Sequence, residues 1–301
     1  MQVDTSIFRS LGRLRLRASG AVRGRQQGER MARKTGSGVE FSDHRRYQPG
    51  DDLRRVDWNA WQRQPEHVML RLFSEDRNMR VAVLLDATGS MGTRADAQGR
   101  TKLDHAGTLV AGIALLCLTN RDFVRVGCFG GKNGAEAANG HDMSALPGVL
   151  ELLGRTQLGR GIEDPKSTLL ALSEGRRSDI ALLVSDMLAP EDELEDTLRA
   201  LASIGQQPIL MHVVSPDDLE PDLTHSQRLV DAETGQSVEI AGGPSVQRAW
   251  RQAVTEWLAD LDSRCRRLGI RRVEIHTDHS LEQVFRNQLQ RAGLVQLGAR
   301  G

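Results

Sequence analysis

The stretch Val81-Ala-Val-Leu-Leu-Asp86-Ala-Thr88-Gly-Ser90 decides the fold class of this chain. An uninterrupted apolar run of this length is typical of a parallel strand that is buried on both faces. Asp86 and the glycine turn that follow this run mark the carboxyl end of the strand. A second run, Asp179-Ile-Ala-Leu-Leu-Val184, is followed closely by Asp186. We therefore predict two central strands of a parallel sheet, each with an aspartate at its carboxyl end.

Strands and helices alternate through most of residues 80–291. Further strands are predicted at 123–129, 208–214 and 271–276, and helices at 103–119, 145–155, 166–174, 191–202, 244–268 and 280–291. Alternation of this kind predicts an α/β fold with a doubly wound, mostly parallel sheet and helices on both faces. Residues 130–140 are rich in glycine, alanine and asparagine and predict a loop.

Residues 216–243 interrupt the alternation. Within them, Arg228-Leu-Val-Asp-Ala-Glu-Thr-Gly235 is followed by Ser237-Val-Glu-Ile240. Two short apolar-polar runs on either side of a turn that contains glycine predict a β-hairpin. We expect this hairpin to be an insertion in the α/β domain.

Composition narrows the class of protein. The chain has 301 residues, with 40 basic and 40 acidic side chains, so a nucleic-acid-binding role is not expected. Residues 1–35 hold nine Arg or Lys but only two acids. This basic arm predicts either a solvated helix or a peripheral contact with a membrane surface. No secretory segment and no apolar run of about 20 residues is found, so we expect a cytoplasmic protein.

The polar side chains behind the first strand predict a metal site. Asp86, Thr88 and Ser90 offer a carboxylate and two hydroxyls, hard oxygen donors that suit Mg²⁺ or Mn²⁺ better than Zn²⁺. Ligands of open α/β sheets bind beyond the carboxyl ends of the strands, where Asp186 is also expected. No dinucleotide-binding or P-loop glycine pattern is present.

The longest motif precedes the sheet. It is Gly36-Ser-Gly-Val-Glu-Phe-Ser-Asp-His-Arg-Arg-Tyr-Gln-Pro-Gly-Asp-Asp-Leu-Arg-Arg-Val-Asp-Trp58, and it continues through Val68-Met-Leu-Arg-Leu-Phe-Ser-Glu-Asp76. This motif strongly resembles the hallmark of the domain of unknown function 58 (DUF58) family. The resemblance extends over residues 10–295 and includes Cys265-Arg-Arg-Leu-Gly-Ile270.

The resemblance implies a von Willebrand factor A-like domain over residues 80–295. The segment 36–79 would then be a cap that packs on this core. In the cap, the acids Asp51, Asp52 and Asp57 interleave with Arg45, Arg54 and Arg55 and predict a network of ion pairs.

The pattern Asp86-x-Thr88-x-Ser90 resembles the metal-ion-dependent adhesion site of von Willebrand factor A domains, with Asp186 as the distal aspartate. The family usually supplies a further threonine from the loop before the next helix, and this chain has Leu158-Gly-Arg-Gly-Ile-Glu-Asp164 there. Two alternatives follow. Either Glu163 or Asp164 provides a carboxylate ligand, or Arg160 enters the site and replaces the cation.

Two classes of function are consistent with such a site. The first is a non-enzymatic interaction module; the resemblance implies a MoxR-type AAA+ ATPase as partner, with an unidentified client protein that is assembled or matured. The alternative is a metal-dependent phosphoesterase or other hydrolase. In that alternative Arg94, Lys102 or Arg160 would hold phosphate, and His105 or His212 would transfer protons. The Asp-x-Asp-x-Thr nucleophile motif of one phosphatase class is absent, so we expect that the protein is not an enzyme.

Overall fold

The computed structural model describes residues 1, 3–5, 8–11, 14–17, 39–47, 56–63, 68–75, 78–96, 98–159, 165–173, 177–232 and 235–297. The chain forms two compact units. The larger unit combines Met1–Gln27 with Met79–Gly301, and the smaller unit is Gly28–Asn78.

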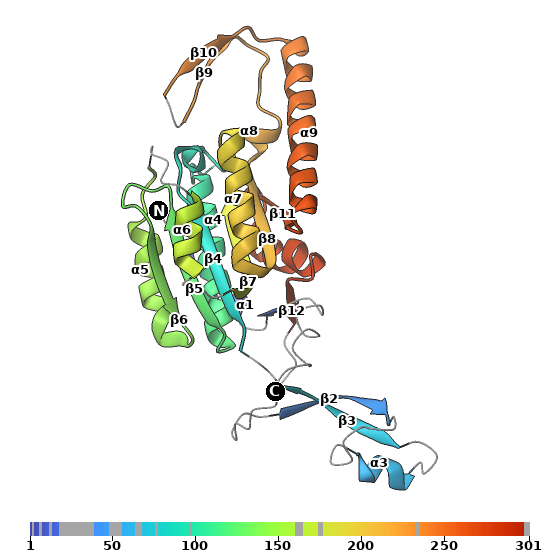
Figure 1. Cartoon of the computed structure of the whole chain (residues 1–301). Coiled ribbons are helices and arrows are strands. Elements are labelled where there is room, and N and C mark those ends of the chain that lie inside the picture. The colour runs from blue at the N-terminus through green and yellow to red at the C-terminus, as the bar shows by residue number, and fades with distance from the viewer. Residues whose placement is uncertain are drawn as a thin grey trace. The chain divides into compact units, whose positions relative to one another are not determined.

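A six-stranded sheet forms the centre of the larger unit (Figure 1). Its order is β11-β8-β7-β4-β5-β6, and all neighbours are parallel except β5 and β6. The strands are β4 (Arg80–Asp86), β5 (Phe123–Phe129), β6 (Glu136–Gly140), β7 (Ser178–Ser185), β8 (Gly205–Val214) and β11 (Arg271–His276). The mostly parallel α/β fold predicted from the sequence is therefore confirmed. Strands β4 and β7 are neighbours at the centre of the sheet. From β4 the chain continues to β5 and β6 on one side, and from β7 it continues to β8 and β11 on the other.

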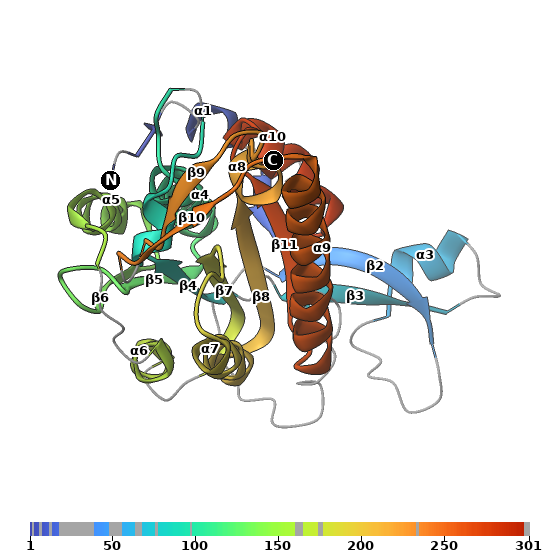
Figure 2. The ribbon, with the colours of Figure 1, turned by 90° about the horizontal axis from the view of Figure 1, so that it is seen from above.

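Helices cover both faces of this sheet (Figure 2). Side chains alternate along a strand, so Val83 of β4 packs in the core cluster of one face and Leu84 in the cluster of the other. The first cluster includes residues of α4 (Lys102–Thr119) and α5 (Leu146–Arg155). The second includes residues of α6 (Pro165–Ser173), α7 (Glu191–Ile204) and α9 (Pro244–Arg267).

Helix α4 is the central helix of its layer. Thr101 caps its first turn by accepting a hydrogen bond from the backbone N–H of Asp104, whose side chain accepts one back from the N–H of Thr101. Among the described helices, α4 alone has the length and hydropathy to cross a membrane, and 83% of it is buried inside the unit. A mostly buried core helix meets the same criteria, so cellular location stays a prediction.

The two ends of the chain meet in the larger unit. Strand β1 (Leu14–Leu16) follows the short helix α1 (Phe8–Leu11) and pairs antiparallel with β12 (Val295–Leu297). Leu11, Leu14 and Leu16 are buried in the core. The described part of the predicted basic arm thus contributes apolar side chains to the core, while residues 18–35 lie outside the described residues.

The predicted last helix of this unit is divided. Helix α10 (Leu281–Gln283) continues into a π-helix, Val284–Leu289.

The prediction of a loop over residues 130–140 was wrong at its end. Residues 136–140 form β6, the antiparallel edge strand of the sheet. Its alanines and glycine have low intrinsic strand preference, so pairing with β5 decides the conformation. Gly140 also has a packing role, because a Cβ there would lie 2.1 Å from the side chain of Ala145.

The predicted hairpin is confirmed. Strands β9 (Gln227–Val230) and β10 (Ser237–Ile240) pair antiparallel, and the short helix α8 (Pro216–Leu219) precedes them. At the base of the hairpin, the N–H of Gly243 donates to the carbonyl of Leu223 over 2.8 Å. In Figure 1 the hairpin and α8 lie at the end of the sheet where β8 ends.

The smaller unit contains β2 (Val39–Arg46), α3 (Trp58–Arg63) and β3 (Met69–Glu75). β2 and β3 pair antiparallel with a register shift between Phe41 and Asp43. Trp58 and Trp61 are exposed and make an edge-to-face contact with ring centroids 5.9 Å apart. Of the predicted ion-pair network, residues 48–55 lie outside the described residues, so the network and the cap stay predictions.

Candidate functional site

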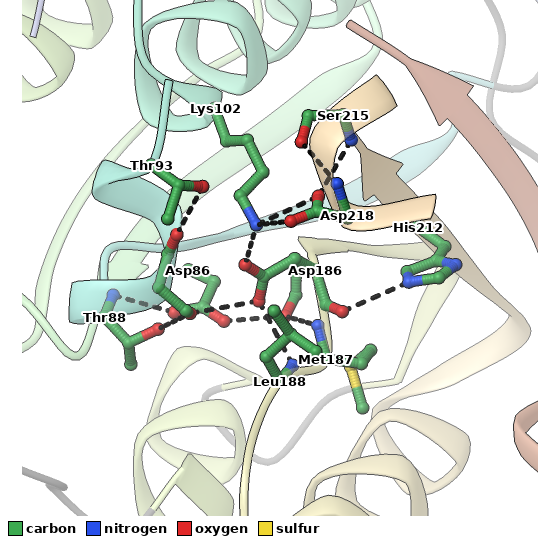
Figure 3. A network of polar contacts seen from close by, with 12 residues as sticks. Asp86, Thr88, Thr93, Lys102, Asp186, Met187, Leu188, His212, Ser215 and Asp218 are labelled. Carbon is green, nitrogen blue, oxygen red and sulfur yellow. Dashed lines mark hydrogen bonds and ion pairs between the residues drawn. The ribbon is translucent and has the colours of Figure 1, made fainter. Parts of the chain in front are cut away.

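Four of the predicted site residues meet at the carboxyl ends of β4 and β7 (Figure 3). Asp86 ends β4, and the 3-10 turn Gly89–Gly92 behind it brings the Thr88 Oγ1 to 3.2 Å from the Ser90 Oγ. The Ser90 Oγ donates to Asp186 Oδ1 over 3.1 Å. Asp86, Thr88, Ser90 and Asp186 therefore form one polar cluster, and their role as metal ligands stays a prediction.

Asp86 is fixed by two donors. Ser185, the last residue of β7, donates its hydroxyl to Asp86 Oδ2 over 2.6 Å, and the Thr88 N–H donates to Asp86 Oδ1 over 2.9 Å. Burial, followed by the nearby carboxylate of Asp186, raises the pKa of Asp86 to about 6, although hydrogen bonds from Ser185 and Thr88 oppose this shift. The ionised form of Asp86 is therefore disfavoured where it stands.

Asp186 accepts from three donors in different parts of the chain. Besides Ser90, the Leu188 N–H donates to its Oδ1 over 3.1 Å, and the Lys102 Nζ lies 2.6 Å from its Oδ2. Met187 follows with a φ of 55°, an uncommon backbone conformation for a residue other than glycine. The Met187 N–H donates to the Ser185 Oγ over 2.9 Å, which helps to hold this turn. Strained backbone of this kind is frequent at functional sites.

Lys102 supplies a positive charge inside the cluster. Its side chain is 0% exposed, and its Nζ also lies 3.2 Å from both carboxylate oxygens of Asp218. Asp218 lies on α8, where its side chain accepts from the Ser215 N–H over 2.8 Å. The sequence indicated Lys102 only as a phosphate-holding candidate. Its partners Asp186 and Asp218 are 84 and 116 residues away in the chain, so no local sequence pattern predicts these contacts.

His212 of β8 contacts the backbone of Asp186. Its Nε2 lies 3.1 Å from the Asp186 carbonyl oxygen, and its Nδ1 lies 2.9 Å from Arg272 Nη1. Because the guanidinium can only donate, Nδ1 accepts and Nε2–H donates to the carbonyl. Burial, followed by the Arg272 charge, lowers the pKa of His212 to about 4. His212 is thus neutral in this arrangement and helps to position Asp186, and the proton-transfer role considered for it stays a prediction.

A second loop docks beside the cluster. The Gly159 N–H donates to the Ala87 carbonyl over 3.0 Å. A Cβ at Gly159 would lie 2.1 Å from the carbonyl oxygen of Gly130, so only glycine fits here. The next residues, 160–164, lie outside the described residues, so the roles predicted for Arg160, Glu163 and Asp164 stay predictions.

The described donors fit a small divalent cation in chemistry and in spacing. Adjacent oxygens of an octahedral shell with ligand distances of about 2.1 Å lie about 3 Å apart. The Thr88–Ser90 and Ser90–Asp186 oxygen pairs are 3.2 and 3.1 Å apart. In the part of the chain that the structure describes, no cluster of three or more His, Cys, Asp or Glu is placed to hold a metal ion. The candidate donor set among the described residues is two carboxylates and two hydroxyls, and ion binding by it stays a prediction.

Comparison with known proteins identifies the family. Residues 43–259, more than half of the chain, match the family described as protein of unknown function DUF58. The chain belongs to the DUF58 family. An uncharacterised protein of Mycobacterium bovis and one of Mycobacterium tuberculosis are each 26% identical to this DUF58 protein over 289 residues, which cover 91% of this chain and 86% of theirs.

Solved structures give more distant likenesses. The conserved hypothetical protein BatB from Bacteroides thetaiotaomicron is 12% identical, with a TM-score of 0.44 and coverage of 72% of this DUF58 chain and 99% of that chain. An aerotolerance-related membrane protein from Bacteroides fragilis is 12% identical, with a TM-score of 0.40 and coverage of 71% and 100%. At these TM-scores the likeness supports no inference about function.

Proposed function

We propose that this DUF58 protein is a non-enzymatic interaction module with a von Willebrand factor A-like domain. In this proposal Asp86, Thr88, Ser90 and Asp186 hold Mg²⁺ or Mn²⁺ at the carboxyl edge of the sheet, and a carboxylate of a partner protein completes the coordination. The observation that carries the proposal is the convergence of these four side chains from two adjacent strand ends.

Charge supports a cation at this place. Burial and Asp186 together disfavour the ionised form of Asp86. The buried ammonium of Lys102 contacts Asp186 and Asp218, and the hydrogen bonds of Asp86 come from the neutral donors Ser185 and Thr88. A divalent ion beside Asp86 would therefore relieve the repulsion between the two carboxylates.

The partner that the family resemblance implies is a MoxR-type AAA+ ATPase, acting with a client protein. An open coordination position on the ion would accept an exposed Asp or Glu of either. A metal–carboxylate bond in a partly dry interface can exceed an ordinary surface ion pair, which is worth about 0–1 kcal/mol. Binding would then depend on the ion and be reversed by a chelator.

The hydrolase alternative receives less support from the side chains considered for it. Lys102 is held between Asp186 and Asp218, and the Arg94 Nε donates to the Asp96 carbonyl. His212 is held neutral between Arg272 and the Asp186 carbonyl, and His105 is buried. None of these four is presented as a proton-transfer or phosphate-holding group at the cluster. The module is therefore the proposal we prefer.

Isothermal titration with Mn²⁺, followed by affinity capture with Mn²⁺ or with chelator, tests the proposal. The intact chain is expected to bind Mn²⁺, and Asp86→Ala is expected to lose both that binding and the partner that it captures. Asp179→Ala is the matched control, because Asp179 lies at the opposite end of β7. The proposal is refuted if wild type and Asp86→Ala capture equal amounts of a MoxR-type ATPase, both with Mn²⁺ and with chelator.

A further inference from the structure

We propose that Lys102 is a resident cation that competes with a bound divalent ion for Asp186 and thereby determines how tightly the site holds that ion. This inference rests on the proposed function for the identity of the site and deepens it. It concerns a residue that the Asp-x-Thr-x-Ser pattern does not contain.

The contacts of Asp186 carry the first step. One carboxylate serves both sides: its Oδ1 accepts from Ser90, and its Oδ2 contacts the Lys102 ammonium over 2.6 Å (Figure 3). An ion held by Ser90 and Asp186 Oδ1 would share this single carboxylate with Lys102. Two cations that share one carboxylate in a buried place repel each other and divide its charge. Lys102 must therefore weaken the binding of the ion.

The charge of the cluster carries the second step. Asp86, Asp186 and Asp218 can contribute three negative charges, and Lys102 contributes one positive charge. The excess of two negative charges among these four groups matches a divalent ion. Without Lys102 the same groups would hold a divalent ion more tightly, which suits a permanent structural ion better than an exchangeable one.

Asp218 carries the third step, because it gives the ammonium a second partner. Its side chain is 24% exposed, and both of its carboxylate oxygens lie 3.2 Å from the Lys102 Nζ. When a bound ion weakens the contact between Lys102 and Asp186, Lys102 can keep its ion pair with Asp218 on α8. Asp218 thus lowers the cost of weakening the Lys102–Asp186 contact and favours ion binding.

Two variants with opposite expected effects test this inference. Lys102→Met keeps the apolar stem but removes the charge, so Mn²⁺ is expected to bind at least tenfold more tightly in isothermal titration. Asp218→Asn keeps an oxygen acceptor for the α8 cap but removes the second partner, so Mn²⁺ is expected to bind several-fold more weakly. The rise in melting temperature at saturating Mn²⁺ should change in the same directions.

Lys132→Met is the control for loss of a positive charge. Lys132 is exposed on the loop after β5, at the same edge of the sheet, and its variant should bind Mn²⁺ within twofold of wild type. Mn²⁺ binding in a folded Lys102→Met that is equal to or weaker than wild type would overturn the inference. Should Lys102→Met fail to melt cooperatively, unchanged affinity in Asp218→Asn would overturn it equally.

The outcomes separate this inference from the proposed function. If wild type binds no Mn²⁺ but Lys102→Met does, the metal-dependent function fails while Lys102 is established as the cation that fills the site. If neither protein binds Mn²⁺, both fail. Tighter binding in Lys102→Met than in a wild type that also binds supports both.

Discussion

Ser185 at the end of β7 donates its hydroxyl to Asp86 at the end of β4 across 2.6 Å. This bond joins the two central strands at their carboxyl ends and sets the direction of the Asp86 carboxylate. The same carboxylate is buried and lies near Asp186, which together raise its pKa to about 6. In the proposed function, this arrangement would favour a bound cation and lower the stability of the ion-free protein, as is common at functional sites.

The first prediction is that Asp86→Asn stabilises the protein in the absence of divalent ions. A carboxyl whose folded pKa is raised from 3.8 to about 6 contributes stability below pH 3.8 that is lost as the pH rises through 6. Two pKa units correspond to about 3 kcal/mol, an upper bound for the gain at pH 7.5. The amide can still accept from the Thr88 N–H and can donate to the Ser185 Oγ. Denaturant unfolding in chelator measures the change.

Asp96→Asn is the control with the opposite sign. Asp96 accepts from the Arg100 backbone N–H and from the Arg100 Nε, and these contacts hold its pKa below the usual value despite some desolvation. Its amide variant should therefore be slightly less stable than wild type. A loss of stability in Asp86→Asn at pH 7.5 would contradict the electrostatic account of the site.

The sequence predicted the framework of the site better than its charge balance. The runs before Asp86 and Asp186 determine two buried strands, and parallel pairing then brings both acids to one edge. Lys102 could not be assigned in this way. A lysine at the start of an apolar helix is usually solvated, and only the packing of α4 against β7 and α8 brings it to Asp186 and Asp218. Strand β6 was missed for a similar reason, since its pairing with β5 overrides its composition.

A second prediction concerns acid stability. His105 of α4 is buried, and neither of its ring nitrogens has a hydrogen-bond partner among the residues that the structure describes. Burial, with a smaller effect of Arg100, lowers its pKa to about 4. A histidine with a depressed pKa costs stability as the pH falls from 6.5 toward 4, because only the unfolded chain takes up the proton. For His105 the loss between pH 7 and pH 5 is about 2 kcal/mol.

His105→Leu should remove that loss, with stability at pH 7 unchanged or higher because an unpartnered polar group leaves the core. Urea unfolding at pH 7 and pH 5 gives the comparison. His225→Leu, at an exposed position of the loop before β9, is the control and should keep the wild-type dependence on pH. His212 keeps a similar dependence in every variant, since its pKa is also lowered to about 4. If the free energy of unfolding falls equally from pH 7 to pH 5 in His105→Leu and in wild type, His105 does not titrate with the lowered pKa that its burial requires.

A third prediction concerns the docking of the loop beside Thr88. Gly159→Ala places a Cβ 2.1 Å from the Gly130 carbonyl oxygen, which must move the backbone of one of the two loops. We expect a loss of roughly 2 kcal/mol or more, together with weaker Mn²⁺ binding because the bond from Gly159 to Ala87 is disturbed.

Gly148→Ala is the matched control for this substitution. Gly148 lies in α5 with open space around its missing Cβ. Alanine is expected to stabilise the helix there by about 0.5–1 kcal/mol. Thermal unfolding of both variants in chelator separates steric conflict from helix propensity. Equal stability of Gly159→Ala and wild type would show that the two loops do not need to approach this closely.

The fourth prediction isolates one hydroxyl of the candidate metal site. Thr88→Val keeps the shape of the side chain and the backbone bond from the Thr88 N–H to Asp86, and it removes only the Oγ1 that lies near the Ser90 Oγ. Mn²⁺ affinity is expected to fall at least tenfold, because one ligand oxygen is lost. Stability in chelator should change by less than about 1 kcal/mol, since the lost hydrogen bond is only part-buried.

Thr93→Val makes the same chemical change five residues later. The Thr93 Oγ1 donates to the Ser90 carbonyl over 3.1 Å, so this hydroxyl supports the turn and is not in the proposed ligand set. Its variant should lose some stability and bind Mn²⁺ within about threefold of wild type. If both variants weaken Mn²⁺ equally, the hydroxyl of Thr88 acts through the shape of the turn. If only Thr88→Val loses Mn²⁺ affinity, the Thr88 hydroxyl belongs to the coordination shell. Both variants replace a threonine by valine, but Thr88 loses a hydroxyl near the Ser90 Oγ and Thr93 loses one that is bonded to the Ser90 carbonyl.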